Sequence, residues 1–301
     1  MTFEIPLAGP RGEPVDLLRT LLSHGVADLP PGRVDEDAGT YETTVALPAA
    51  RPRTIRIGPA GPGTARIDVR GPRLGERATG ALLATVRGML NLEEDLSEFY
   101  AAAAEDPELS WAARGAGRML RTPTVFEAVV KTVCTTNCAW SATVRMVTAL
   151  VEHLGEQAVA TEGRAFPTAE AMAAAPESFY RDVVRAGYRS AYLRSLASGV
   201  AGGMIELEGL GASSSDLPDD EVAARLLALP GIGPYGTAHM MMLLGRHSRL
   251  VLDSWTRPKY ARVRGRKATD AQIERRFRRY GRYAGLAFWL YLTRDWVPLE
   301  P

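Results

Sequence analysis

A tight turn between two apolar helical segments limits, more than any other feature, how this chain can fold. The turn reads Leu-Pro-Gly-Ile-Gly-Pro and spans residues 229–234. Apolar residues at helical spacing precede it from Asp219, and a second helix is expected to begin near Pro234. Glycine adopts positive φ without strain and lets the backbone approach a ligand closely. The pattern therefore predicts two helices joined by a hairpin.

The amino-terminal end of the second helix is a candidate anion site. Its first amide groups have no partner within the helix and lie at the positive end of the helix dipole. Phosphate is the natural occupant of such a site, and Gly231 and Gly233 would let it reach the backbone. The same turn also occurs as a plain connection that binds nothing, so the turn alone leaves both interpretations open.

Asp253 is the second informative element. It follows Tyr235 by 18 residues and comes directly after the apolar pair Val251-Leu252. The residues after it, 254–258, can open another helix. An aspartate in this place can cap that helix through its side-chain oxygen. The carboxylate can also be a catalytic group held at a helix start, and the two roles are compatible.

These residues resemble the helix–hairpin–helix superfamily of DNA glycosylases, in which a hairpin is followed by a catalytic Asp. The resemblance rests on Leu-Pro-Gly-Ile-Gly, the small residues after it and the spacing to Val-Leu-Asp. Residues 90–100 resemble the segment that leads into the family's helical domain, and residues 121–140 its next helix and duplex-entering loop. Residues 187–196 resemble the segment ahead of the hairpin in 8-oxoguanine glycosylases.

The fold class expected is mostly α, with an amino-terminal α+β domain that resembles the extra domain of 3-methyladenine DNA glycosylase II and 8-oxoguanine glycosylase. Alternating apolar residues predict strands at 41–47, 55–57 and 67–69, forming a small antiparallel sheet with helices at 15–26 and 79–90. Strand signals nearly vanish after Leu92. We place the α+β domain at 1–115 and a helical glycosylase domain, with the hairpin at 229–236, at 116–301.

Within the helical domain, apolar spacing predicts three further helical faces. They pass through Val125, Val129 and Val133, through residues 140–154, and through Ile273, Phe277 and Tyr280. Cys134 and Cys138 are four residues apart, which would put them on one helical face. We expect them to be packing residues, since no third or fourth metal ligand is evident, and we expect no metal site.

The resemblance implies base excision from DNA. Cleavage of an N-glycosidic bond develops positive charge on the sugar, and a buried carboxylate stabilises that charge and helps to deprotonate water. By resemblance Asp253 is the catalytic residue. Bifunctional members carry a lysine just after the hairpin glycines, where this chain has Tyr235, so no lyase activity is expected. No cysteine follows Asp253, so no iron–sulfur cluster is expected, while the resemblance allows a monovalent cation at the hairpin.

Other residues have candidate roles at the same site. Tyr235, His239 one helical turn later, and Trp255 would form the pocket for the flipped base, where aromatic walls suit stacking. His239 could instead be a structural histidine, and Trp255 an ordinary core residue. Asn137 lies in the duplex-entering loop and by resemblance would contact the estranged base; the alternative is a helix cap.

Charge is balanced overall, with 36 basic and 35 acidic residues, but residues 241–301 carry a net charge of +9 and the rest −8. Such a segment suits a polyanion. Arg275 and Arg279 are our candidates for phosphate contact. A solvated helix surface is the alternative for the whole cluster, which contains Arg262, Arg264, Arg266, Lys267, Arg275, Arg276, Arg278, Arg279 and Arg282.

The sequence shows neither an apolar run of about 20 residues nor the basic and apolar regions of a signal peptide. We expect a cytoplasmic, nucleoid-associated monomer whose partner is double-stranded DNA with a damaged base. The activity expected is that of a monofunctional glycosylase for alkylated purines, with an oxidised-purine glycosylase as the alternative. A non-catalytic DNA-binding protein that uses the hairpin as a phosphate clamp is the alternative from another class.

Overall fold

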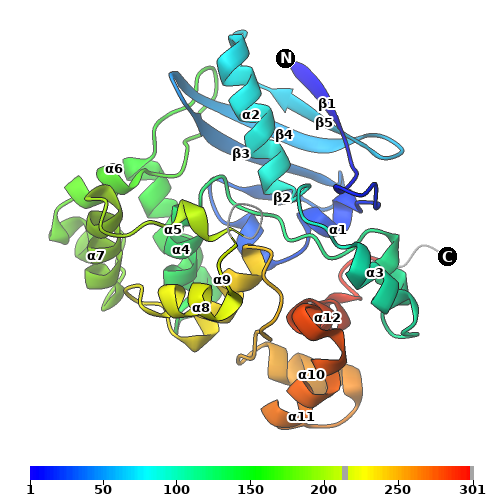
Figure 1. Cartoon of the computed structure of the whole chain (residues 1–301). Coiled ribbons are helices and arrows are strands. Elements are labelled where there is room, and N and C mark those ends of the chain that lie inside the picture. Colours follow the sequence, from blue (N-terminus) through cyan, green and yellow to red (C-terminus); the bar gives the residue numbers. More distant parts are fainter. Residues whose placement is uncertain (212–215, 299–301) are drawn as a thin grey trace.

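The computed structural model describes residues 1–211 and 216–298 and begins with an α+β region. Its five strands pair antiparallel in the order β1-β5-β4-β3-β2. Helix α2 crosses one face of this sheet (Figure 1). The elements of the region are β1 (Thr2–Pro6), α1 (Leu17–Leu21), η1 (Gly25–Asp28), β2 (Arg33–Asp35), β3 (Thr40–Leu47), β4 (Ala50–Gly61), β5 (Thr64–Val69) and α2 (Glu76–Met89).

The predicted strands are confirmed and lengthened. Tyr41, Ile57 and Ile67 lie opposite one another on β3, β4 and β5, and all three side chains are buried. Alternation of this kind places one face of each strand against a core. The edge strands β1 and β2 show no clear alternation of apolar residues in the sequence, because β1 buries only Ile5 and β2 is three residues long.

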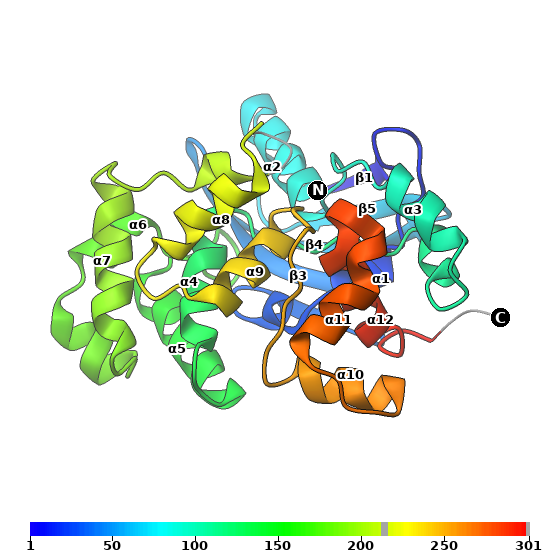
Figure 2. The ribbon, with the colours of Figure 1, turned by 60° about the horizontal axis from the view of Figure 1, so that its bottom comes forward.

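The rest of the described chain is helical. Helices α4 to α9 form one group, and α10 to α12 form a second group next to α3 (Figures 1 and 2). The elements are α3 (Ser97–Ala104), η2 (Ser110–Arg114), α4 (Val125–Thr135), α5 (Trp140–Leu154), α6 (Ala169–Ala174), η3 (Phe179–Val183), α7 (Arg189–Ala201), η4 (Glu208–Leu210), α8 (Asp219–Leu227), α9 (Pro234–Leu243), α10 (Thr256–Arg264), α11 (Asp270–Phe277), η6 (Arg278–Tyr283) and α12 (Ala284–Thr293). The expected fold class, mostly α with an amino-terminal antiparallel sheet, is confirmed.

Two hydrophobic cores divide the molecule. One lies under the sheet and α2, and includes residues up to Leu92 together with Leu120. The other core contains buried residues from Leu96 onward, in all the later helices, and also Val26 and Leu29. Helix α3 and η2 therefore pack with the helical part, so the change from one core to the other lies before residue 115.

Three local expectations were wrong. The helix expected at 15–26 is only α1, because the chain then turns away so that the Ser23 hydroxyl accepts the Leu120 N–H and His24 contacts the Leu120 carbonyl. Cys134 and Cys138 do not share a helical face, because α4 ends at Thr135 and Asn137 has φ of +44°. Trp140 and Val144, expected on an apolar face of α5, are exposed.

Candidate active site

The hairpin between α8 and α9 has the predicted geometry. Gly231 has φ of +81°, and a Cβ at this position would lie 3.0 Å from the Tyr192 ring, so a side chain would be both strained and crowded. Gly233 precedes Pro234 at the start of α9, and among the described residues no side chain caps this helix end. The first amides of α9 thus have no side-chain partner in that part of the chain, as an anion site requires.

Asp253 lies just before α10, and both its carboxylate and its backbone N–H form hydrogen bonds with the start of that helix. Its Oδ1 accepts the N–H groups of Trp255 at 2.8 Å and Thr256 at 2.6 Å, while its own N–H donates to the Thr256 hydroxyl at 2.8 Å. Its Oδ2 accepts no hydrogen bond from any residue that the structure describes. Asp253 therefore bonds to the backbone at the start of α10, as a capping residue does, and these bonds hold its carboxylate through Oδ1.

Tyr235 and His239 lie on one face of α9 and stack on each other. Their ring centroids are 5.9 Å apart and the planes differ by 19°. Burial raises the pKa of Tyr235, and the negative charge of Asp253 raises it further, against a hydrogen bond with Thr135. Burial lowers the pKa of His239 to about 3, with a smaller contribution from His24, so its imidazole is neutral at pH 7.

Trp255 belongs to a cluster of three tryptophans. Its ring lies 5.7 Å from that of Trp289 and 5.8 Å from that of Trp296, and it keeps 41% of its surface exposed. Trp289 is buried and donates its Nε1–H to the Ser23 carbonyl. This cluster joins the start of α10 to α12 and the turn after α1, and Trp255, two residues after Asp253, stays partly exposed.

Exposed aromatic residues at the starts of α5 and α7 lie near the loop at Asn137. Asn137 does not cap α5, whose start at Ala139 has no side-chain cap. Its amide instead lies 3.5 Å from the Tyr188 hydroxyl, and the Tyr188 ring lies 6.0 Å from that of Tyr192, which touches Gly231. Exposed Tyr188 and Tyr192 thus link this loop to the hairpin, and Trp140, at the start of α5, is exposed as well. The signal available was their aromatic character near the motif, but exposure was not readable from spacing.

The basic cluster separates into paired and unpaired members. Arg276 pairs with Glu108, Arg279 with Asp106 and Arg282 with Glu98, so these three connect α11 and η6 to the α3–η2 region. Ile273, Phe277 and Tyr280 are buried, as predicted for one face of this segment. No ion pair within the described ranges involves Arg262, Arg264, Arg266, Lys267, Arg275 or Arg278.

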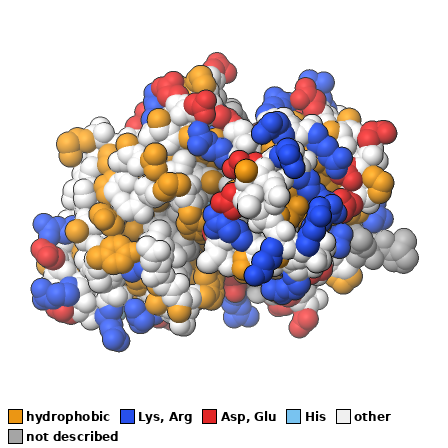
Figure 3. All heavy atoms as spheres, turned by 90° about the horizontal axis from the view of Figure 1, so that it is seen from below, with side chains coloured by type: hydrophobic (Ala, Val, Ile, Leu, Met, Phe, Trp, Pro, Cys, Tyr) orange, Lys and Arg blue, Asp and Glu red, His pale blue; other side chains and the backbone are white. Residues whose placement is uncertain are grey.

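Several of the unpaired cations share a hollow. A groove of about 350 Å³ is lined by Arg264, Arg266, Lys267, Arg275 and the paired Arg276, with no acidic side chain among its lining residues. Figure 3 shows basic side chains gathered on the half of the lower face that carries α10 and α11, whereas the other half is largely apolar and uncharged. Of the two candidates for phosphate contact, Arg275 is free and Arg279 is held by Asp106.

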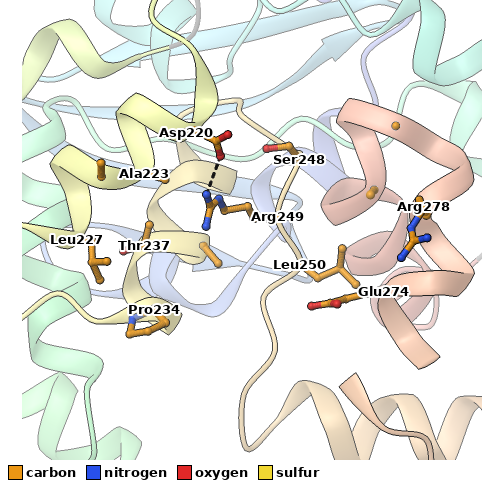
Figure 4. A pocket seen from close by; sticks show the side chains of 14 residues that line it. Asp220, Ala223, Leu227, Pro234, Thr237, Ser248, Arg249, Leu250, Glu274 and Arg278 are labelled. Atoms are coloured by element: carbon orange, nitrogen blue, oxygen red, sulfur yellow. Dashed lines mark hydrogen bonds and ion pairs between the residues drawn. The ribbon is translucent and has the colours of Figure 1, made fainter. Parts of the chain in front are cut away.

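A pocket of about 810 Å³ lies between α8, the start of α9 and α11, on a different face of α9 from Tyr235 and His239. Arg249 points toward Asp220 within it, at 2.8 Å, and Leu250, Glu274 and Arg278 line its other side (Figure 4). None of the candidate site residues lines this pocket. In the described ranges, no group of three or more His, Cys, Asp or Glu could hold a metal ion, and none of the helices is long and apolar enough to span a membrane.

The sequence matches no protein-family model and no curated protein. Comparison of the fold with solved structures is informative. The 3-methyladenine DNA glycosylase from Archaeoglobus fulgidus aligns over 98% of this chain and 100% of its own, with a TM-score of 0.73 and 19% identity. MBOgg1, solved with a low-affinity DNA ligand, aligns over 98% and 96%, also with a TM-score of 0.73 and 19% identity.

A third structure is the Clostridium acetobutylicum 8-oxoguanine glycosylase/lyase in complex with double-stranded DNA containing cytosine opposite 8-oxoguanine. It aligns over 93% of this chain and 92% of its own, with a TM-score of 0.69 and 19% identity. The chain has the DNA glycosylase fold. Within this fold, Tyr235 follows the hairpin at the start of α9 and stacks on His239, and the charge of Asp253 acts on the Tyr235 hydroxyl. Both the alkylpurine and the oxoguanine type are similar to it, so the fold does not separate the two.

Proposed function

We propose that the protein is a monofunctional DNA glycosylase that flips a damaged base out of duplex DNA and hydrolyses its N-glycosidic bond. The observation that carries the proposal is the carboxylate of Asp253, which is fixed through Oδ1 and open at Oδ2. A pure DNA clamp has no use for an open carboxylate facing a polyanion. A glycosylase needs one, because positive charge develops on the sugar as the bond breaks.

The mechanism follows from the order of the groups. The backbone amides of the hairpin hold a phosphate next to the lesion, and the flipped nucleotide places its C1′ near Asp253. As the base departs, Oδ2 stabilises the oxocarbenium-like sugar and can take a proton from the attacking water. No acid partner is needed when the leaving base is already cationic. The exposed rings at Trp140, Tyr188 and Tyr192 suit contact with the bases left behind.

Alkylated purines are the proposed substrates. Tyr235 and the open face of Trp255 offer aromatic surfaces beside Asp253, and a cationic purine gains about 0.5–2 kcal/mol from stacking on such a ring. Oxidised purines are the second candidate, since residues 187–196 resemble oxoguanine glycosylases and one fold neighbour is such an enzyme. The test is base release from a panel of duplexes carrying single alkylated or oxidised purines. If neither alkylated nor oxidised purines were released, the alternative of a non-catalytic DNA-binding protein would remain.

Base release should leave an intact abasic site. Tyr235 has no amine with which to form a Schiff base, and Lys131, Lys259 and Lys267 are accounted for elsewhere: Lys131 is buried against Glu127, Lys259 pairs with Asp295, and Lys267 lies in the basic groove. Borohydride added during turnover should therefore trap no protein–DNA conjugate. Trapping that survives blockage of the terminal amine would show lyase chemistry and contradict the monofunctional assignment.

The unpaired arginines should set the salt dependence of DNA binding. Replacing Arg264, Arg266 and Arg275 by Ala should weaken binding similarly for all sequences. It should also flatten the slope of log affinity against log salt by about 0.9 for each lost contact, or by about 2.7 if all three arginines contact phosphate. The matched control replaces Arg66, Arg73 and Arg77, three arginines of the amino-terminal region, and should leave the slope unchanged. If the two triple variants had equal slopes, the arginines of the groove would be solvated and would make no phosphate contact.

A further inference from the structure

Arg189 is a buried charged residue that the proposed mechanism does not use. It is the first residue of α7, which packs against α4 (Figure 2), and only 6% of its surface is exposed. No carboxylate within the described ranges pairs with it, and its guanidinium donates to uncharged oxygens, one on Ala186 and two on Thr136. Burying a charge is costly unless hydrogen bonds offset the loss of water. These contacts therefore indicate what the burial of Arg189 serves.

The bonds to Thr136 hold the loop between α4 and α5, residues 136–139, which we name the Asn137 loop. Arg189 Nε donates to the Thr136 hydroxyl at 3.2 Å, and Nη2 donates to the Thr136 carbonyl. Helix α4 ends just before this loop, and Asn137 has φ of +44°, a left-handed conformation that is uncommon outside glycine. The Thr136 carbonyl belongs to the peptide that enters Asn137, so its bond to Arg189 fixes the orientation of that peptide.

The guanidinium also orders Tyr188. Its central carbon lies 4.5 Å from the centroid of the Tyr188 ring, which places the cation against the aromatic face. The Tyr188 hydroxyl lies 3.5 Å from the side-chain nitrogen of Asn137, and the Tyr188 ring lies 6.0 Å from that of Tyr192, the residue that contacts Gly231 of the hairpin. Asn137 and Tyr188 are both exposed. One buried cation thus holds two exposed side chains beside each other.

We infer that Arg189 is a positioning residue for base flipping: it holds the Asn137 loop and Tyr188 in the arrangement in which they enter the duplex, and it does not contact DNA itself. The inference rests on the proposed function and deepens it. A loop that is already ordered loses less conformational entropy when it inserts. Arginine suits this task, because its planar guanidinium donates in several fixed directions and stacks on a ring at the same time, whereas the ammonium group of lysine does not.

The first measurement uses the free protein. Cys138 lies in the Asn137 loop and is partly exposed, whereas Cys134 is fully buried, so a thiol reagent such as dithionitrobenzoate should react at Cys138. Arg189→Ala and Arg189→Lys should each raise the rate of this reaction by about tenfold or more, because charge-assisted hydrogen bonds to the loop are lost. The control is Arg194→Ala, at an exposed arginine of α7 that pairs with Glu177, and it should leave the rate unchanged. An unchanged rate in the two Arg189 variants would overturn the inference.

The second measurement is single-turnover release of 7-methylguanine from two duplexes, one with cytosine and one with an abasic-site analogue opposite the lesion. A base without a partner is easier to flip. With cytosine, Arg189→Ala should lower the rate by about 10- to 100-fold, the effect of losing hydrogen bonds to a charged group. With the abasic-site analogue, the loss should be less than about threefold, because little opening is required. An equal loss on both duplexes would show a general structural defect and contradict the inference.

Two further outcomes separate this role from others. The slope of log affinity against log salt should be the same for Arg189→Ala and the wild type, since a residue that does not touch phosphate releases no counterions. A flatter slope would make Arg189 a phosphate contact and reject the positioning role. If the wild-type chain released no base from either duplex, the proposed function would fail, while the reaction of Cys138, measured without DNA, would still show whether Arg189 holds the loop.

Discussion

Asp253→Asn should abolish base excision while DNA affinity stays the same or rises. The amide of Asn retains an oxygen that can accept the Trp255 and Thr256 N–H groups, so the start of α10 should keep its shape. What is lost is the negative charge of Oδ2. Removing one preorganised electrostatic stabiliser costs about 100- to 1,000-fold in rate. Losing a full negative charge beside a developing cation should lower the rate by at least as much. Single-turnover release from a lesion duplex measures it.

Asp270→Asn provides the matched control. Asp270 is the first residue of α11, is half exposed and pairs with Arg257. Like Asp253 it is a carboxylate at the start of a helix, but it is not one of the candidate site residues. Its replacement should leave the excision rate within about twofold, because exposed ion pairs contribute little. If Asp253→Asn retained activity within a few-fold of the wild type, Asp253 would not be the catalytic group and the proposed mechanism would fail.

Lys131→Met should lower the free energy of unfolding by about 3–5 kcal/mol, because it leaves a buried carboxylate without its partner. Lys131 and Glu127 lie one turn apart on α4, 2.7 Å from each other, with side chains 0% and 3% exposed. The ammonium group also donates to the Leu29 carbonyl. Burial already raises the pKa of Glu127 despite the attraction of Lys131. Equilibrium denaturation in urea or guanidinium measures the loss.

An exposed pair with the same spacing is the control. Glu221 and Arg225 on α8 are also four residues apart, but their side chains are 45% and 51% exposed. Arg225→Met should cost less than about 0.5 kcal/mol. The double replacement of Glu127 by Leu and Lys131 by Met should recover most of the stability, since an apolar pair removes the need to bury charge. Similar losses for Lys131→Met and Arg225→Met would show that burial is not the cause.

The sequence was sufficient for elements whose signal is local. Glycine at positions 231 and 233 followed by Pro234 defines the hairpin whatever surrounds it, because φ of +81° at Gly231 is costly for other residues. Alternation in β3, β4 and β5 and the buried face of α11 were also readable, since burial follows the period of the element. The spacing from Tyr235 to Asp253 placed the carboxylate after α9, and the fold comparison agrees with the resemblance built on that spacing.

Contacts between distant segments depended on the tertiary structure. The helix expected at 15–26 stops early because Ser23 and His24 bond to Leu120, a residue about a hundred positions later that no local pattern reveals. The basic cluster divides into paired and free members only because α3 and η2 bring Glu98, Asp106 and Glu108 to it. Likewise, His24 of the amino-terminal region packs edge to face against His239 of α9, which the sequence does not reveal. Sequence spacing determines which residues share a face of one element, whereas packing decides which faces meet.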